Sequence, residues 1–345
     1  MKKLVYYFFR GWISLGLFCY YRKINVNGLE NIPKNKPVLF LSNHQNALID
    51  ALLIATQCSR KPWFLTRSDV FANTFFKTLF GFLQMLPIYR IRDGRNKLSK
   101  NHAIFDQCAE LLIQNKAIAI FPEANHSLKR RVRPLSKGFT RIIDNALHQN
   151  PNLDLQLVPV GQNYKRPLQV GDSAALYFGK PISVRDLVEN LEGNLVSAMK
   201  TRVFEQLKQL TTHIEDETNY DTVIERLNGA NVDFLNPKGV NKMVLDKSFS
   251  KGKEIPLVSV DPNRFFFYLI NLPVVFLWRL LLKPRVPEPE FMATFRFAFS
   301  MLIYPLFYLI WFLTLQYTFS VSISLGIVFA HGIVNLFLVK MELNY

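Results

Sequence analysis

The sequence predicts an α/β protein: a layered domain with a mixed sheet, preceded by an N-terminal interfacial helix and followed by C-terminal transmembrane helices. Residues 36–182 alternate short β-rich runs with segments of helix length. Residues 261–345 hold 20 of the 47 aromatic side chains, six basic residues and four acidic ones, so +14 of the net charge of +16 falls on residues 1–260. An apolar tail on a basic body is typical of a membrane-bound protein. The apolar content of 49% excludes a disordered chain.

Six runs in the body have the composition of β-strands, and helix-length segments lie between several of them. The strand candidates are PVLFL (37–41), PWFLT (62–66), LPIYRI (86–91), AIAIF (117–121), LQLVPV (155–160) and ALYFG (175–179). The predicted helices cover residues 46–57, 97–115, 137–149 and 185–215. This alternation predicts a partly parallel sheet covered by helices. The expected organisation is an N-terminal membrane-associated helix (1–24), an α/β domain (25–215), a polar connector (216–260) and a C-terminal membrane region with a helical hairpin (261–345).

The two ends of the chain carry the membrane signals. Residues 1–24 place basic residues around an aromatic middle, with no small-residue cleavage site after it, which favours an uncleaved interfacial helix. Residues 297–339 contain no Lys, Arg, Asp or Glu. A single helix of that length would measure about 64 Å, twice a hydrocarbon core of about 30 Å. The segment is therefore predicted to fold back near Gln316–Ser320, with Arg296 and Lys340 on the cytoplasmic side.

A third apolar run, Phe265–Leu282, is interrupted by Asn271, Pro273 and Arg279. Hydropathy leaves open whether this run spans the bilayer, dips into it or lies in the interface. The three cysteines form no CxxC pair, which suits a reduced, cytosolic setting.

Polar side chains follow two of the predicted strands at the edge where α/β sheets gather functional groups. Asn43 and His44 follow the first run and Asp50 comes six residues after His44, while Glu123 and His126 follow another run. A histidine oriented by a carboxylate is the minimal general base for a hydroxyl that attacks an acyl carbon. A spacing of six residues would separate the pair by about 240° inside one helix, so the pair requires His44 in the turn before the helix. The alternative is a hydrogen-bonded turn histidine with an aspartate in the first helical turn.

A basic run follows Glu123, with no acidic residue inside it. Its members are Lys129, Arg130, Arg131, Arg133, Lys137 and Arg141. Such a run forms either a solvated face or, beside a strand-end site, a binding surface for phosphates or anionic lipid headgroups. Arg90, at the end of LPIYR, is a similar candidate. The sequence lacks GxSxG, GxxxxGK[ST], GxGxxG and HExxH, and neither a metal nor a redox cofactor is expected.

Four motifs in this order, SNHQNALID, LPIYR, FPEANHS and LVPV, resemble the phospholipid/glycerol acyltransferase family, over roughly residues 35–182. The resemblance implies transfer of a fatty acyl group from acyl-CoA or acyl-carrier protein to a hydroxyl of glycerol-3-phosphate or a lysophospholipid. It also implies His44 as the general base and Asp50 as its orienting partner. The residues expected to bind substrate are Asn43, Arg90, Glu123, His126, Ser127, Arg130 and Lys137.

Two features depart from the family pattern. Five residues separate His44 from Asp50 where four are usual. In the second loop, usually FPEGTRS, this chain has Ala124, Asn125 and His126 in place of Gly, Thr and Arg. The expected protein is a membrane-bound acyltransferase of phospholipid synthesis at the cytoplasmic membrane, its catalytic domain facing the cytoplasm. Its expected partners are the acyl donor, the glycerolipid acceptor and the bilayer, without nucleic acid.

Two alternatives remain: a membrane-anchored lipid esterase, and a basic lipid-binding protein without enzymatic activity. The esterase would need a nucleophile, and no motif in the sequence supplies a convincing one. The exact acceptor, the acyl-chain length, the choice between CoA and carrier protein as donor, and the oligomeric state follow from no pattern in the sequence.

Overall fold

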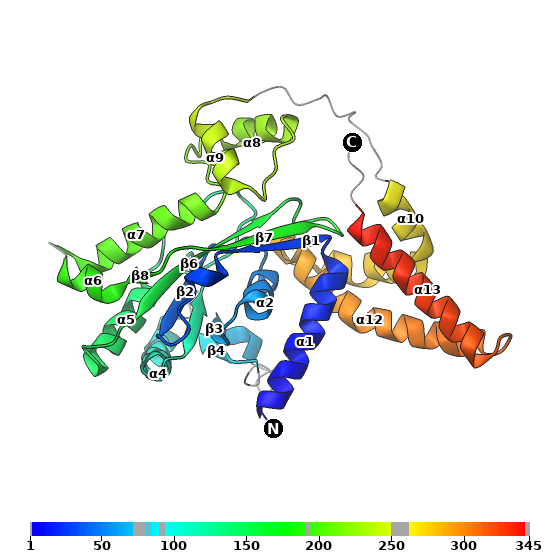
Figure 1. The fold of residues 1–345 in the computed structure, drawn as a ribbon, viewed down its shortest axis with the longest axis horizontal. Helices are drawn as coiled ribbons and strands as arrows, with labels where there is room; N and C mark the ends of the chain where they lie inside the picture. Colours follow the sequence, from blue (N-terminus) through cyan, green and yellow to red (C-terminus); the bar gives the residue numbers. More distant parts are fainter. Residues whose placement is uncertain are drawn as a thin grey trace.

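The computed structural model describes residues 2–71, 81, 83–89, 94–190, 193–249 and 262–341. Within them an eight-stranded mixed sheet has the order β1-β7-β6-β2-β5-β3-β4, with β8 paired to β6 (Figure 1). The strands are β1 (Lys23–Asn27), β2 (Val38–Ser42), β3 (Pro62–Arg67), β4 (Met85–Ile88), β5 (Ala117–Ile120), β6 (Gln156–Tyr164), β7 (Ser173–Phe178) and β8 (Ile182–Ser183). All pairs are parallel except β6 with β7 and β6 with β8. The predicted α/β fold with a mixed sheet is confirmed.

Helices cover both faces of the sheet, because successive side chains of a strand point to opposite faces. On β2, Val38 and Phe40 pack toward one helical layer, while Leu39 and Leu41 pack toward the other. The first layer consists of α1 (Lys2–Tyr20) and α2 (Leu48–Gln57). The second consists of α4 (Asn101–Ile113), α5 (Gly138–Gln149) and α7 (Leu195–Leu210). The result is a three-layer sandwich with two apolar cores.

Each of the six predicted strand runs overlaps an observed strand, whereas β1 and β8 were not expected. β1 reads KINVN, in which polar and apolar residues alternate at the edge of the sheet, and β8 has two residues. The helix predicted over 185–215 is divided into α6 (Val184–Glu189) and α7. Ser183 and Asn194 cap the two pieces, since each side chain accepts a hydrogen bond from a backbone N–H three residues on.

The segment predicted as a polar connector contains two helices. These are α8 (Tyr220–Gly229) and α9 (Pro237–Leu245), which lie beside α7 (Figure 1). Leu227, Phe234 and Val240 form a small apolar cluster between them. The helices were not predicted because this stretch is mostly polar, and only a few apolar residues form the contact between them.

The C-terminal region contains α10 (Pro262–Ile270), α11 (Leu272–Leu277), a π-helical turn (Trp278–Leu282), α12 (Met292–Leu315) and α13 (Val321–Lys340). α12 and α13 are both long and apolar enough to cross a bilayer. With 24 and 20 residues they measure about 36 and 30 Å, against a hydrocarbon core of about 30 Å. The chain reverses between them, over residues 316–320, where the sequence predicted the turn. The third apolar run is bent by 93° between α10 and α11.

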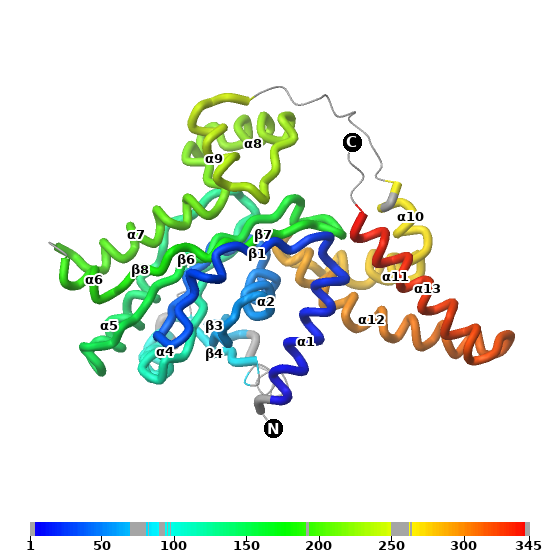
Figure 2. Tube along the Cα trace, viewed as in Figure 1, coloured from blue at the N-terminus to red at the C-terminus, as the bar shows by residue number. Residues whose placement is uncertain are grey.

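The hairpin of α12 and α13 joins the sheet domain at both of its ends (Figure 2). The Arg296 guanidinium donates to the Leu168 carbonyl at 2.9 Å, and Lys340 Nζ donates to the Tyr21 carbonyl at 2.8 Å. The Phe297 ring packs edge-on against Tyr20, with centroids 5.6 Å apart, and belongs to the same apolar core as α1 and α2. The start of α12 is therefore part of the domain core.

Candidate active site

The site begins where β2 and β5 end. These strands are parallel neighbours with Leu41 opposite Ile120, so their carboxyl ends lie side by side. His44 lies in the turn between β2 and α2, ahead of the first helical residue, Leu48. Asp50 lies in the first turn of α2. The six-residue spacing can therefore bring the two side chains together.

Asp50 is fully buried and accepts four hydrogen bonds. Its Oδ2 accepts from His44 Nδ1 at 2.7 Å and from the backbone N–H groups of Gln45 and Asn46, both at 2.8 Å. Its Oδ1 accepts from the Tyr164 hydroxyl at 2.5 Å. Because a backbone N–H can only donate, Oδ2 acts as an acceptor and His44 Nδ1 carries the proton. The lone pair of the imidazole is then on Nε2.

The His44 ring is held flat against Phe121, with ring centroids 4.1 Å apart and an interplanar angle of 19°. The His44 carbonyl accepts a hydrogen bond from the Ser127 backbone N–H at 3.0 Å, which ties the β2 turn to the β5 loop. Among the described residues, no group forms a hydrogen bond with His44 Nε2, and the side chain is 17% exposed. The arrangement thus presents an oriented proton acceptor at an accessible position.

Glu123 lies at the other strand end and is buried. Arg133 donates to its Oε2 from Nε at 2.9 Å and from Nη2 at 2.5 Å. Burial raises the pKa of Glu123, and the adjacent Arg133 guanidinium opposes that rise. Arg133 also bonds the side chain and carbonyl of Asn125, so it organises the whole loop. Ala124, between them, has φ = +67°, a conformation that glycine adopts at lower cost.

His126 connects this loop to the C-terminal region. Its ring lies edge-on to the His44 ring at 5.7 Å between centroids, and edge-on to Phe291 at 4.5 Å. Its Nε2 lies 2.8 Å from Glu288 Oε2. Neither Glu288 nor Phe291 was predicted as part of the site, because 162 residues separate Glu288 from His126 in the chain.

Two residues that were predicted to bind substrate form hydrogen bonds with backbone groups inside the domain. The Asn43 amide pairs with the backbone of Gln162 on β6, accepting from its N–H at 2.8 Å and donating to its carbonyl at 3.0 Å. The buried Arg130 guanidinium donates to the carbonyls of Tyr164 and Lys165 at 2.9 and 3.1 Å and lies 3.6 Å from the centre of the Phe234 ring. Burial lowers the pKa of Arg130 to about 10. Both side chains are thus directed into the domain, and a strand-end position does not decide which way a side chain turns.

The rest of the basic run is not one phosphate-binding patch. Lys129 lies over the Tyr220 ring at 5.2 Å, and Arg131 pairs with Glu217 at 3.0 Å. Lys137 is exposed directly before α5. Arg90 lies outside the described residues. Within the described part of the chain, no group of three or more His, Cys, Asp or Glu side chains has an arrangement suited to a metal ion.

Part of the chain is similar to known acyltransferases. A chloroplastic 1-acyl-sn-glycerol-3-phosphate acyltransferase of Arabidopsis thaliana is 28% identical over 138 residues, which cover 40% of this chain and 36% of that protein. A chloroplastic enzyme of the same description from Brassica napus is 26% identical over 138 residues, covering 40% and 38%. The chain thus spans little more than a third of these relatives.

A solved structure also matches, that of the 1-acyl-sn-glycerophosphate acyltransferase PlsC from Thermotoga maritima. Its TM-score is 0.44 at 18% sequence identity, over 60% of this chain and 81% of that chain. Residues 23–162 match the family model described as Acyltransferase, and these residues contain His44, Asp50 and the whole FPEANHS loop. Over these residues the chain is similar to acyltransferases.

Proposed function

We propose that the protein is a membrane-bound O-acyltransferase of phospholipid synthesis. It moves a fatty acyl group from acyl-CoA or acyl-carrier protein, a co-substrate, to a hydroxyl of glycerol-3-phosphate or a lysophospholipid. The observation that carries the proposal is the oriented His44, whose Nδ1 bonds a buried carboxylate while Nε2 is open. The names of the two chloroplastic relatives support a glycerolipid acceptor.

The reaction is a direct transfer. The acceptor hydroxyl gives its proton to His44 Nε2 as its oxygen attacks the thioester carbonyl. Asp50 stabilises the imidazolium that forms. When the tetrahedral intermediate collapses, the C–S bond breaks, the ester remains on the acceptor, and the imidazolium returns its proton to the leaving thiolate. Among the described residues, no Ser or Cys side chain forms a hydrogen bond with the His44 ring, so an acyl-enzyme has no nucleophile bonded to the base.

The β5 loop is the proposed acceptor site, with Glu123, His126 and Ser127 beside the glycerol moiety. Glu123 and Ser127 are fixed by Arg133 and by the His44 carbonyl respectively, which gives the loop one arrangement. Lys137 and Arg90 remain proposed partners of a phosphate.

The proposed location is the cytoplasmic membrane, with the sheet domain on the cytoplasmic side. Both ends of the α12–α13 hairpin meet the sheet domain, so two spanning helices leave that domain on one face of the bilayer. Resistance of the full-length chain to alkaline carbonate, and its release by detergent, would test this placement. Release by carbonate would contradict a spanning hairpin.

The activity is tested by incubating purified protein with labelled acyl-CoA, or acyl-carrier protein, and a panel of acceptors. Glycerol-3-phosphate, lysophosphatidic acid and lysophosphatidylcholine form the panel, with His44→Ala as the inactive control. We expect labelled ester with at least one phosphorylated acceptor. Release of free fatty acid without an acceptor would favour the esterase. Lipid binding without turnover, unaffected by His44→Ala, would favour the lipid-binding protein.

A further inference from the structure

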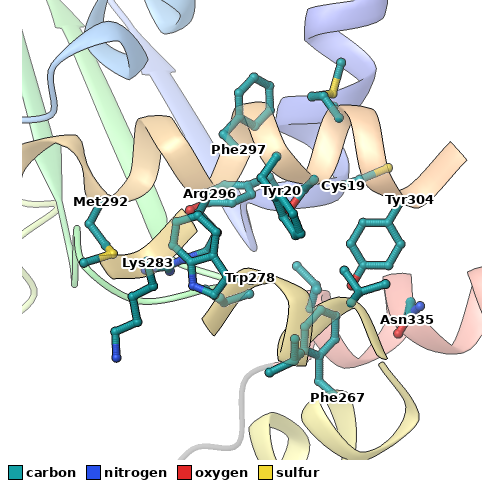
Figure 3. Close-up of a pocket in the computed structure, with 18 of the residues that line it drawn as sticks. Cys19, Tyr20, Phe267, Trp278, Lys283, Met292, Arg296, Phe297, Tyr304 and Asn335 are labelled. Carbon is teal, nitrogen blue, oxygen red and sulfur yellow. The ribbon is translucent and has the colours of Figure 1, made fainter. Parts of the chain in front are cut away.

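A cavity of about 860 Å³ lies between α1 and the helices of the C-terminal region. Its wall is mostly apolar and aromatic, with Tyr20 from α1, Trp278 from the π-helical turn, Tyr304 from α12 and Asn335 from α13 (Figure 3). The volume falls within the range of about 300–1,000 Å³ that is usual for small-molecule sites. None of the described residues that line it belongs to the matched family domain, residues 23–162.

A polar network joins the helices that surround this space. The buried Asn271, at the 93° bend between α10 and α11, exchanges two hydrogen bonds with Asn335, at 2.5 and 3.0 Å. Asn335 Nδ2 also donates to the Tyr308 hydroxyl at 3.1 Å. Amide groups buried among apolar helices are costly unless paired, so the mutual pairing favours this one arrangement. The bend places α10 beside α13 and leaves the cavity between them and α12.

The charged residues that line the cavity are mainly cationic. They include Arg264, Arg279, Lys283 and Arg296, against a single carboxylate, Glu288. The first three are exposed, while Arg296 is half-buried. Glu288 already pairs with His126. An apolar cavity with four cations complements an amphiphile that has an anionic headgroup.

The cavity adjoins the proposed active site. Glu288 belongs to its lining and at the same time bonds His126, whose ring lies next to that of His44. The β5 loop itself has a histidine where the family pattern has arginine, and Arg130 is turned into the domain. Positive charge for a headgroup phosphate is therefore available at the cavity, from residues of the C-terminal region.

We propose that this cavity binds the hydrocarbon chain of a monoacyl glycerolipid with a phosphate headgroup, the acceptor of the acyl transfer. This assignment rests on the proposed function. The phosphate lies among the cationic residues, and the free hydroxyl is directed to His44. The acceptor fits better than the donor for a physical reason. A monoacyl lipid resides in the bilayer and reaches a cavity among apolar helices laterally, whereas acyl-CoA and acyl-carrier protein arrive from water.

Narrowing the cavity tests the assignment. At Gly332, in its lining, an added Cβ would meet only the Tyr308 hydroxyl, at 3.7 Å, so Gly332→Leu extends into the space. Gly326→Leu, on the same helix with nothing within 4 Å of the added Cβ, is the matched control. We expect Gly332→Leu to raise the KM for oleoyl lysophosphatidic acid about tenfold, the effect of excluding about two methylenes. The KM values for octanoyl lysophosphatidic acid and for the acyl donor should stay unchanged.

A charge variant tests whether the cationic residues bind the headgroup, and it does not narrow the cavity as Gly332→Leu does. Arg279→Gln removes one lining cation, and Arg285→Gln, on the same segment but outside the lining, is its control. We expect Arg279→Gln to raise the KM for lysophosphatidic acid about threefold to tenfold, the range of one ordinary net hydrogen bond, because Arg279 is exposed. Arg285→Gln should leave it unchanged. Equal effects of the two variants would overturn the headgroup assignment.

Failure of the inference and failure of the proposed function give different results. An altered donor-chain preference in Gly332→Leu, with the acceptor KM unchanged, would assign the cavity to the donor and overturn the inference. If the wild type transfers no acyl group, the proposed function fails. Binding then still tests the cavity, because lysophosphatidic acid with a brominated chain should quench Trp278 fluorescence in the wild type and less in Gly332→Leu. Equal quenching in wild type, Gly332→Leu and Trp278→Phe would exclude a lipid in this cavity.

Discussion

The sheet domain and the C-terminal helices both bury polar side chains, but they satisfy them in different ways. Asp50, in the first turn of α2, takes two of its four hydrogen bonds from backbone N–H groups of the turn that precedes this helix. Asn271 and Asn335, in the helical region, mainly satisfy each other through their side chains. A helix uses its backbone groups internally, so polar side chains between helices depend on one another.

The difference suits the two roles proposed above: proton transfer in the sheet domain and binding of a lipid chain among the C-terminal helices. Backbone amides fix Asp50, and Asp50 fixes the His44 ring, which is what proton transfer at one atom requires. The helices enclose a wide apolar space, which suits a flexible hydrocarbon chain. Besides the hydrogen bonds at the two ends of the hairpin, the two regions meet at the Phe297 ring inside the domain core and at the pair of Glu288 and His126 beside the proposed active site.

The largest effect is expected in the sheet domain, from His44→Ala. Loss of the general base should lower the kcat/KM of acyl transfer by about 10²–10⁴-fold. Thermal unfolding should change little, because Asp50 keeps its bonds to Gln45, Asn46 and Tyr164. Initial rates and circular dichroism check both parts. His148→Ala, an exposed histidine on α5, is the control, and near-normal turnover of His44→Ala would refute the catalytic assignment.

A large loss of stability is expected where α12 packs into the core of the sheet domain. Phe297→Ala should destabilise the protein by about 3–5 kcal/mol, the usual cost of truncating a buried aromatic ring. Phe297 is a C-terminal residue that packs in the core with Leu17 and Tyr20. Thermal unfolding in detergent measures the change. Phe329→Ala, an exposed position on α13, should have a small effect, and equal losses for the two would show that the regions are independent.

A pH-dependent effect is expected at Asp172, next to the edge of the sheet. Burial raises the pKa of its carboxyl from 3.8 to about 6, although backbone N–H groups at Arg166 and Ser173 bond it. The raised pKa means that the folded state favours the neutral form of the carboxyl. The free energy of unfolding therefore has its full value below pH 4 and decreases as pH rises through 6.

Asp172→Asn removes this titration. The variant should exceed the wild type by up to about 3 kcal/mol above pH 6 and match it near pH 4, since one pKa unit corresponds to about 1.4 kcal/mol. Denaturant unfolding at pH 4, 5, 6 and 7 checks the profile. A difference that is constant across this range would show that the carboxyl is not destabilised by burial.

The smallest effect is expected at the contact between the regions. Glu288 is 56% exposed on its side chain, and exposed ion pairs contribute about 0–1 kcal/mol. Glu288→Gln should therefore raise the KM of the acceptor by no more than about fivefold, with kcat nearly unchanged. Glu290→Gln, in the short 3₁₀ helix Pro289–Phe291 that directly follows Glu288, is the control. A large fall in kcat would instead make Glu288 part of the catalytic step.

Local sequence determined the features that depend on composition over a few turns or strands. The apolar runs specified six strands, and 43 residues without charge specified a hairpin, because burial of apolar side chains is a property of the segment itself. The placement of His44 and Glu123 after strand ends, and of Asp50 in the next helix, followed from the same patterns. Their proximity required only that β2 and β5 be parallel neighbours.

Tertiary structure alone decided which polar groups face the site. Asn43 and His44 are adjacent in the chain, yet Asn43 turns inward because the Gln162 backbone on β6 offers both a donor and an acceptor. Arg130 turns inward because two carbonyls at the end of β6 lie within its reach. Glu288 enters the site only because the start of α12 packs into the domain core. The direction of each side chain and its hydrogen-bond partner are set by groups distant in sequence. A linear pattern of residue types contains no information about those groups.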